Sequence, residues 1–304
     1  MKLSTVYRAS AIAVSAIALL AIPTATTSAL ASSKDAALQL QQHGQSTYSL
    51  KYTALGDSVA AGLGYNNNQG TEEDRACGRS QEAYVYDVAQ KLNAKLSGTP
   101  VNVSPTNISC QGATTRNLLE SQTVNGVTVQ PQLDTAFNGG APNLLTITSG
   151  ANDVHWASFI GACFTAAHCD TPENTTAVQN YINAMAADMK TALQNVKKRS
   201  TFIPPIVVAT GYYTPVSAAC SNANFTPTEV AWVQNATAKL NTAIKNATQG
   251  SYWFARFAPV DFTGHDICSA DSWIQRPGES APFHPTPKGQ EVIAQSVLSA
   301  IGIQ

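Results

Sequence analysis

Short apolar runs alternate with longer stretches of helical periodicity after residue 48, and this alternation constrains the fold more than any other feature of the chain. The apolar runs predict strands at 51–55, 101–109, 143–148, 206–210 and 252–260. The periodic stretches predict helices at 82–96, 175–196, 226–247 and 287–301, with a helix start at 114–120. Strands that alternate with helices of this length predict a three-layer, doubly wound α/β fold around a central parallel sheet.

The composition excludes several classes of partner. The 304 residues carry 18 Lys and Arg against 19 Asp and Glu, so the net charge is -1. The chain therefore lacks the excess of positive charge that is typical of proteins that bind nucleic acid. This balance also argues against strong attraction to an anionic membrane, so contact with lipid would rest on apolar area. We expect a monomer without a nucleic-acid partner.

The first 31 residues predict a secretory signal peptide. Lys2 and Arg8 precede an apolar run at 11–22, and small residues then lead to an A-x-A cleavage site at 29–31. The alternative is a membrane anchor, but the run is shorter than the roughly 20 residues that a spanning helix needs. We expect cleavage near Ala31, a polar lead-in at 32–47, one domain at 48–304, no integral membrane span and a secreted protein.

Six cysteines fit an exported protein, because an even number in such a chain indicates disulfides. About fifteen pairings are possible in principle. Zinc binding is the alternative, but the chain contains no C-x-x-C pair of the kind that zinc sites show. The cysteines are Cys77, Cys110, Cys163, Cys169, Cys220 and Cys268.

Four short segments place reactive or donor groups after predicted strands or before predicted helices. In doubly wound folds, ligands bind beyond the carboxyl ends of the strands. The first segment, Gly56-Asp57-Ser58, exposes a serine at a strand tip, where a base could activate its hydroxyl. The alternative for Ser58 is an ordinary helix cap.

The other three segments are equally ambiguous one by one. Gly112 in 110–114 lets a backbone N–H approach a ligand, or it simply forms a strand-to-helix turn. Asn152 in 149–153 offers an amide donor, or it belongs to a turn-forming Asn-Asp pair. His284, held in a loop by two prolines, titrates near neutrality and suits a general base, or it is a surface histidine.

Together, in this chain order, the four segments resemble the blocks of the SGNH or GDSL hydrolases. Ser58 in GDS, Gly112 in CQGAT, Asn152 in GAND and His284 in FHPT match the Ser, Gly, Asn and His that mark that family. The resemblance implies a flavodoxin-like three-layer α/β/α sandwich and a serine hydrolase with Ser58 as nucleophile and His284 as base. It also implies an oxyanion hole made by the backbone N–H groups of Ser58 and Gly112 and the Asn152 amide.

The cysteines and the predicted signal peptide are similar to those of secreted lipases and esterases of actinobacterial type. That likeness implies three sequential bridges: Cys77–Cys110, Cys163–Cys169 and Cys220–Cys268.

One position departs from the family pattern. The family places an aspartate three residues before the histidine, and this chain has Ala281 there. A backbone carbonyl of Ala281 or Pro282 could orient His284 instead. The competing hypothesis is a carboxylate from elsewhere in the chain: Asp261, Asp266, Asp271 or Glu279.

The expected activity is hydrolysis of carboxylic esters through an acyl-enzyme on Ser58, with small-molecule or lipid esters as substrates and no metal or organic cofactor. Lipid or fatty-acyl esters are favoured. Acetylated carbohydrates are the alternative substrate, and a non-catalytic exported binding module is the alternative of a different class.

Overall fold

Five parallel strands form the centre of the computed structural model, in the spatial order β2-β1-β5-β6-β7. They are β1 (Tyr48–Gly56), β2 (Val101–Asn107), β5 (Leu144–Thr148), β6 (Ile206–Thr210) and β7 (Ala255–Ala258). The structure describes residues 48–303 except 66–69, 166–167, 223–224 and 250–251. The predicted signal peptide (1–31) and lead-in (32–47) lie outside the described residues.

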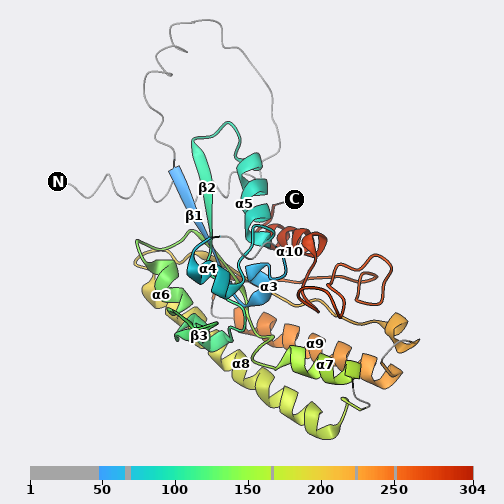
Figure 1. Cartoon of the computed structure of the whole chain (residues 1–304). Coiled ribbons are helices and arrows are strands. Elements are labelled where there is room, and N and C mark those ends of the chain that lie inside the picture. The colour runs from blue at the N-terminus through green and yellow to red at the C-terminus, as the bar shows by residue number, and fades with distance from the viewer. Residues whose placement is uncertain (1–47, 66–69, 166–167, 223–224, 250–251, 304) are drawn as a thin grey trace, which may run out of the picture. The chain divides into compact units, whose positions relative to one another are not determined.

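Helices cover both faces of this sheet. On one face, α5 (Tyr84–Lys95) packs on β1 and β2 and against α10 (Pro287–Ala300), which packs on β6 and β7. On the other face, α6 (Gln132–Phe137) packs on β1, α9 (Pro227–Thr248) on β6 and β7, and α8 (Pro172–Arg199) along α9 (Figure 1). The predicted three-layer α/β fold is therefore confirmed. No helix in the described part of the chain is long and apolar enough to cross a membrane.

Shorter elements occupy the connections. They are α3 (Ser58–Ala61), α4 (Glu72–Cys77), α7 (Trp156–Thr165), the 3₁₀ turns η2 (Thr115–Leu118) and η3 (Ala218–Asn222), and a hairpin of β3 (Gln122–Val124) and β4 (Val127–Val129). The helix start expected at 114–120 is limited to the single turn η2. Thr114 and Asn117 form a capping box at its start, but the turn ends at its C-cap, Leu119, and the chain then continues into β3.

The centre of the sheet forms the core. All five residues of β5 are buried, as expected for a strand covered on both faces. The buried face of α8 repeats at Met185, Met189 and Leu193, which the sequence periodicity predicted. Tyr181, on the same predicted face, is 37% exposed and contacts the ring of His155 edge-on.

The strand order creates one switch point. The chain builds β2 on one side of β1 and then returns to build β5 on the other side, which is the flavodoxin-like arrangement. In this arrangement ligands bind at the carboxyl ends of the two strands that flank the switch point. Gly56 of β1 pairs with Thr148 of β5 at these ends, so the segments carrying Ser58 and Asn152 leave the sheet side by side.

Three disulfides link segments outside the strands. They join Cys77 to Cys110, Cys163 to Cys169 and Cys220 to Cys268, which are the sequential pairs that the resemblance implied. The first bridge ties α4 to the segment after β2 that contains Gly112.

Candidate active site

The turn after β1 places Ser58 at the strand tip. Gly56 has a φ of +130°, and a Cβ there would lie 1.9 Å from the carbonyl oxygen of Thr148, so only glycine fits. The Asp57 N–H donates to that same oxygen at 2.9 Å. The Asp57 carboxylate accepts from the Val59 N–H at 2.9 Å and so caps α3. Ser58 is therefore the first residue of a helix that begins directly at the end of the strand.

Ser58 meets His284 across the top of the sheet. Ser58 Oγ lies 2.7 Å from His284 Nε2, although the two residues are 226 positions apart in the chain. Ser58 opens α3 and His284 lies in the loop that leads into α10, so two separate elements supply the pair. Both side chains are partly accessible, which leaves the hydroxyl within reach of a substrate.

A backbone carbonyl holds the other nitrogen of the histidine. His284 Nδ1 lies 3.0 Å from the carbonyl oxygen of Pro282, while the Ala281 carbonyl accepts from the His284 backbone N–H at 3.2 Å. Of the two carbonyls considered from the sequence, that of Pro282 is therefore bonded to Nδ1. Burial lowers the pKa of His284, and the carbonyls of Pro282 and Ala281 oppose that shift. Nδ1 is thus the protonated nitrogen at neutral pH, which leaves Nε2 free to accept the Ser58 proton.

The four carboxylates considered as alternatives are bonded elsewhere, and no hydrogen bond in the described residues joins a carboxylate to the His284 ring. Their partners are Thr263 for Asp261, the Cys268 N–H for Asp266, His265 for Asp271 and the Arg276 N–H for Glu279.

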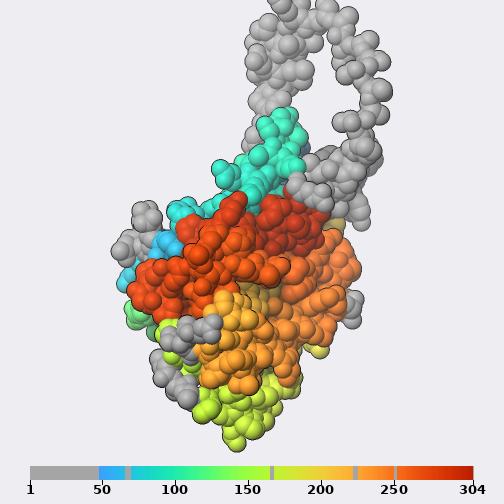
Figure 2. Space-filling view, turned by 90° about the vertical axis from the view of Figure 1, so that its right-hand side faces the viewer, coloured from blue at the N-terminus to red at the C-terminus, as the bar shows by residue number. Residues whose placement is uncertain are grey.

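The histidine loop is braced from two sides. Gln275 exchanges backbone hydrogen bonds with it, accepting from the Phe283 N–H at 2.8 Å and donating to the His284 carbonyl at 2.7 Å. The Tyr213 hydroxyl donates to the Phe283 carbonyl at 2.7 Å. Phe283 has a φ of +68°, which is unusual for a bulky residue and has to be held by its surroundings. In Figure 2, the orange-red segment that contains this loop lies beside the dark red helix α10 on one face of the domain.

Three hydrogen-bond donors surround the carboxyl ends of β1, β2 and β5. Asn152 Nδ2 donates to the Ala113 carbonyl at 2.9 Å, which places this amide beside the Gly112 turn and leaves its second N–H available. The backbone N–H groups of Ser58 and Gly112 have no hydrogen-bond partner in the described part of the chain. Gly112 is exposed and has a φ of +75°, so its N–H belongs to a turn that favours glycine.

Asp153 joins the Asn152 turn to the segment after β2. One of its carboxylate oxygens accepts from the backbone N–H of Thr115 at 2.9 Å and from the Thr115 hydroxyl at 3.1 Å. The Thr115 hydroxyl also lies 3.0 Å from Ser149 Oγ. Burial raises the pKa of Asp153, and the Thr115 hydrogen bonds oppose the shift. These contacts fix the position of Asn152 relative to Gly112.

Two buried glutamines support the Ser58 turn, and neither was predicted from the sequence. Gln132 of α6 bonds both backbone groups of Gly56, at 2.7 Å to the N–H and 2.9 Å to the carbonyl. Gln290 of α10 donates to the Val59 carbonyl at 2.9 Å and accepts from the Tyr84 N–H at 3.0 Å. Single glutamines in helices give no sequence signal, because their partners lie far away in the chain.

Tyr212, which follows β6, was also missed. Its hydroxyl lies 2.5 Å from a carboxylate oxygen of Asp57 and accepts from the Ala151 N–H at 3.2 Å. Burial raises the pKa of Asp57 to about 7, with the Tyr212 hydrogen bond opposing the shift. Tyr212 thereby links the turn that carries Ser58 to the turn that carries Asn152.

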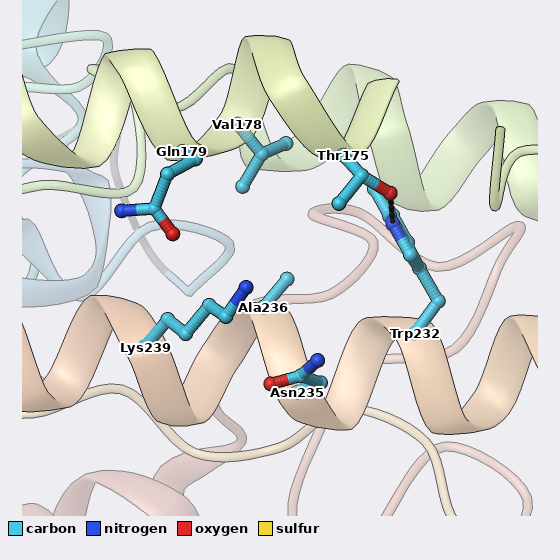
Figure 3. A pocket seen from close by; sticks show the side chains of 7 residues that line it. All are labelled: Thr175, Val178, Gln179, Trp232, Asn235, Ala236 and Lys239. Atoms are coloured by element: carbon cyan, nitrogen blue, oxygen red, sulfur yellow. Dashed lines mark hydrogen bonds between the residues drawn. The ribbon is translucent and has the colours of Figure 1, made fainter. Parts of the chain in front are cut away.

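Two hollows in the described residues lie away from Ser58, Gly112, Asn152 and His284, none of which lines them. One lies between α8 and α9 and is lined by Thr175, Val178, Gln179, Trp232, Asn235, Ala236 and Lys239 (Figure 3). Its volume of about 20 Å³ holds no more than a water molecule. The other, of about 460 Å³, is open and lies between α10 and the segment after β7.

One cluster in the described residues has the composition of a metal site. It consists of Cys220, Asp266 and Cys268, but the two sulfur atoms form a disulfide and cannot act as thiolate ligands. Asp266 already accepts from the Cys268 N–H at 2.9 Å. The cluster is therefore explained as a bridge with a neighbouring carboxylate.

Comparison with known proteins finds relatives over most of this chain. The chain is 27% identical over 277 residues to Lipase 2 of Streptomyces coelicolor, covering 85% of this chain and 88% of that protein. Among solved structures, the extracellular lipase of Streptomyces rimosus superposes with a TM-score of 0.65 at 23% identity, covering 83% of this chain and 99% of that one. Phospholipase A1 of Streptomyces albidoflavus superposes with a TM-score of 0.59 at 21% identity, with the same coverage.

The family match spans most of the described domain. The sequence model of the GDSL-like lipase/acylhydrolase family matches residues 54–292, a range that starts four residues before Ser58 and ends after His284. The fold, the order of the four segments and this match lead to one assignment. The chain belongs to the GDSL-like lipase/acylhydrolase family and is a serine ester hydrolase.

Proposed function

We propose that Ser58 is the nucleophile and His284 the general base of a carboxylic ester hydrolase. The contact of 2.7 Å between Ser58 Oγ and His284 Nε2 carries this proposal. A serine hydroxyl is a weak nucleophile, and a base within hydrogen-bond reach is what activates it. The histidine is oriented by a carbonyl, because Nδ1 is bonded to Pro282.

The reaction proceeds in two steps. Nε2 of His284 takes the hydroxyl proton while Ser58 Oγ bonds to the ester carbonyl carbon, and the alcohol then leaves with that proton. A water molecule then attacks the acyl carbon and gives a proton to Nε2, and Nε2 passes that proton to Ser58 Oγ as the acyl–oxygen bond breaks and the carboxylic acid leaves. Neither step needs a metal or an organic cofactor.

The charge on the carbonyl oxygen is stabilised by the unpaired donors around the strand ends. The backbone N–H groups of Ser58 and Gly112 and the free N–H of the Asn152 amide form the proposed oxyanion hole. Preorganised donors of this type are often the largest catalytic contribution, of about 3–4 kcal/mol for one donor. The links from Asp153 and Tyr212 to the Asn152 turn keep this donor fixed.

We propose fatty-acyl or lipid esters as the substrate class. The relatives named above are lipases and a phospholipase A1, which supports this choice over acetylated carbohydrates. We also propose that the protein is secreted after cleavage near Ala31 and acts as a monomer. The three disulfides and the extracellular relative from Streptomyces rimosus support the secreted location.

A hydrolysis panel tests the proposal. The panel holds short-acyl and long-acyl p-nitrophenyl esters, a phospholipid and an acetylated xylan, and it compares wild type with Ser58→Ala and His284→Ala. We expect wild type to prefer the acyl lipids, and each variant to lose most activity while it keeps its melting temperature. Because the two residues act as one unit, the double variant should be little worse than either single one. A folded Ser58→Ala protein with substantial activity would overturn the assignment, and preference for the xylan would overturn the substrate class.

A further inference from the structure

Two consecutive tyrosines, Tyr212 and Tyr213, follow β6 and reach the two halves of the site from the same short segment. The Tyr212 hydroxyl joins Asp57 to Ala151, the residues that precede Ser58 and Asn152. The Tyr213 hydroxyl donates to the Phe283 carbonyl, directly before His284. Both side chains are buried, with exposed fractions of 3% and 5%.

We propose that Tyr212 and Tyr213 are positioning residues of the ester hydrolase, each for a different half of the catalytic machinery. Tyr212 sets the Ser58 turn against the Asn152 turn, and Tyr213 sets the histidine loop. The inference rests on the proposed function, because it assigns these tyrosines to the Ser58, His284 and Asn152 roles argued there.

The segment that carries the tyrosines is itself held rigidly. Asn241 of α9 bonds both backbone groups of Tyr212 at 2.7 Å, accepting from its N–H and donating to its carbonyl. Gly211 permits this close approach, since a Cβ there would lie 3.0 Å from the Asn241 side-chain oxygen and 2.9 Å from the Phe257 ring. Because its backbone is held in this way, the Tyr212 hydroxyl can fix the positions of the groups that it bonds. A mobile side chain could not do so.

The hydroxyl of Tyr212 is a donor and an acceptor at once. Burial raises the pKa of Tyr212 well above its usual value, so the phenol keeps its proton and donates it to Asp57. Its oxygen remains free to accept from Ala151. A phenylalanine at this position would remove both bonds and leave the ring packing unchanged.

The Tyr213 ring is anchored as well. It stacks on Phe262 with ring centroids 4.4 Å apart and planes inclined by 7°. Its hydroxyl holds the carbonyl of Phe283, whose φ of +68° is strained for a residue of this size. The strained residue immediately precedes His284, so a shift of its carbonyl would turn the imidazole away from Ser58.

Double-variant cycles test this inference with a soluble p-nitrophenyl ester and the full chain. Tyr212→Phe and Tyr213→Phe should each lower kcat about tenfold with KM changed less than twofold, because misplacement of reacting groups affects the transition state most. Tyr52→Phe is the matched control. Tyr52 is a buried tyrosine whose hydroxyl bonds Thr146 within the sheet at 3.2 Å, and its loss should leave kcat within twofold.

The cycles separate positioning from general stability. In a His284→Ala background, Tyr213→Phe should cost less than twofold, because no base remains to be held. In an Asn152→Ala background it should still cost about tenfold. Tyr212→Phe should cost less than twofold in the Asn152→Ala background and still about tenfold in the His284→Ala background. If Tyr212→Phe does not fold, Asp57→Asn takes its place in the cycle, because it alters the same hydrogen bond from the carboxylate side, and it should lower kcat by the same factor.

Two outcomes would overturn the inference. One is kcat within twofold of wild type in both tyrosine variants. The other is a loss of kcat that is equal in every background and proportional to the fall in melting temperature. In that case the control Tyr52→Phe would lose kcat in the same proportion. Activity retained in Ser58→Ala would instead contradict the proposed function. The failure of the inference can therefore be distinguished from the failure of the proposed function.

Discussion

The Nδ1 atom of His284 lies 3.0 Å from the carbonyl oxygen of Pro282, which is two residues earlier in the same loop. A carbonyl accepts the Nδ1 proton and fixes the tautomer as a carboxylate would, but it carries no full charge to balance the imidazolium. In the proposed mechanism this carbonyl therefore takes the place of the usual acid, in a loop that contains Pro282 and the strained Phe283.

This arrangement predicts that no single carboxylate completes the site. We expect Asp261→Asn, Asp266→Asn, Asp271→Asn and Glu279→Gln each to keep kcat within about tenfold of wild type, or ~1.4 kcal/mol of barrier. Steady-state kinetics on the four purified variants check this, with melting temperature as the control for folding. An amide variant that folds but loses on the order of 10⁴ in kcat would identify the missing acid and contradict the dyad.

The oxyanion role of Asn152 predicts a selective effect on turnover. Asn152→Ala should lower kcat by about two to three orders of magnitude and change KM much less, because the donor acts on charge that develops in the transition state. Asn93→Ala provides a control, since that asparagine also bonds backbone groups, those of Val103, but lies on α5. An effect of Asn152→Ala confined to KM would show that the amide only binds substrate.

Burial of His284 predicts the acidic limb of the pH profile. The base must be neutral, and its pKa lies below the ordinary value of 6.5. kcat/KM should therefore rise with pH through a midpoint below 6.5 and be flat above it, since this parameter reports the free enzyme. The same limb should persist in Asp57→Asn, which removes a buried carboxyl near the site whose pKa is raised to about 7. A midpoint above 6.5 in both proteins would contradict the assigned environment of the imidazole.

Asp57 predicts a dependence of stability on pH. Its pKa rises from 3.8 in the unfolded chain to about 7 in the fold, so between these values the folded state holds a proton that the unfolded state has lost. Its contribution to the free energy of unfolding is therefore lost progressively as pH rises from about 4, and the loss is complete above about 7.

The measurement is urea unfolding at pH 4, 6 and 8 for wild type and Asp57→Asn. The stability difference should shift in favour of the variant by up to roughly 4 kcal/mol between pH 4 and 8. Glu120→Gln, at an exposed position, controls for the loss of one charge. A constant difference across this range would show that Asp57 is ionised throughout.

The layered fold could be predicted from the sequence because its elements have strong local patterns. The strand predicted at 206–210 agrees in full with β6, and that at 143–148 begins one residue before β5. The strand at 252–260 was too long, since β7 covers only Ala255–Ala258. Helix α7 gave no signal because its ten residues are apolar almost throughout, so they show neither a polar face nor a clear period.

The site could be predicted only in part. Ser58, Gly112, Asn152 and His284 are each ambiguous alone, and they could be predicted because their segments, in this chain order, resemble the four blocks of the SGNH or GDSL hydrolases. The supporting contacts are long-range: the hydroxyl of Tyr212 reaches a carboxylate 155 positions away. The choice between the carbonyls of Ala281 and Pro282 depends on how the loop folds back, which the sequence left open.

The central claim is that Ser58 carries the acyl group and that His284 activates it. Mass spectrometry after reaction with a fluorophosphonate probe tests this most directly, with peptide mapping of wild type, His284→Ala and Tyr52→Phe. The account predicts one adduct, on the peptide containing Ser58, formed at the wild-type rate in Tyr52→Phe and at least a hundredfold more slowly in His284→Ala, because loss of the base leaves an unactivated hydroxyl. An adduct on another residue, or a rate at Ser58 unaffected by His284→Ala, would contradict it.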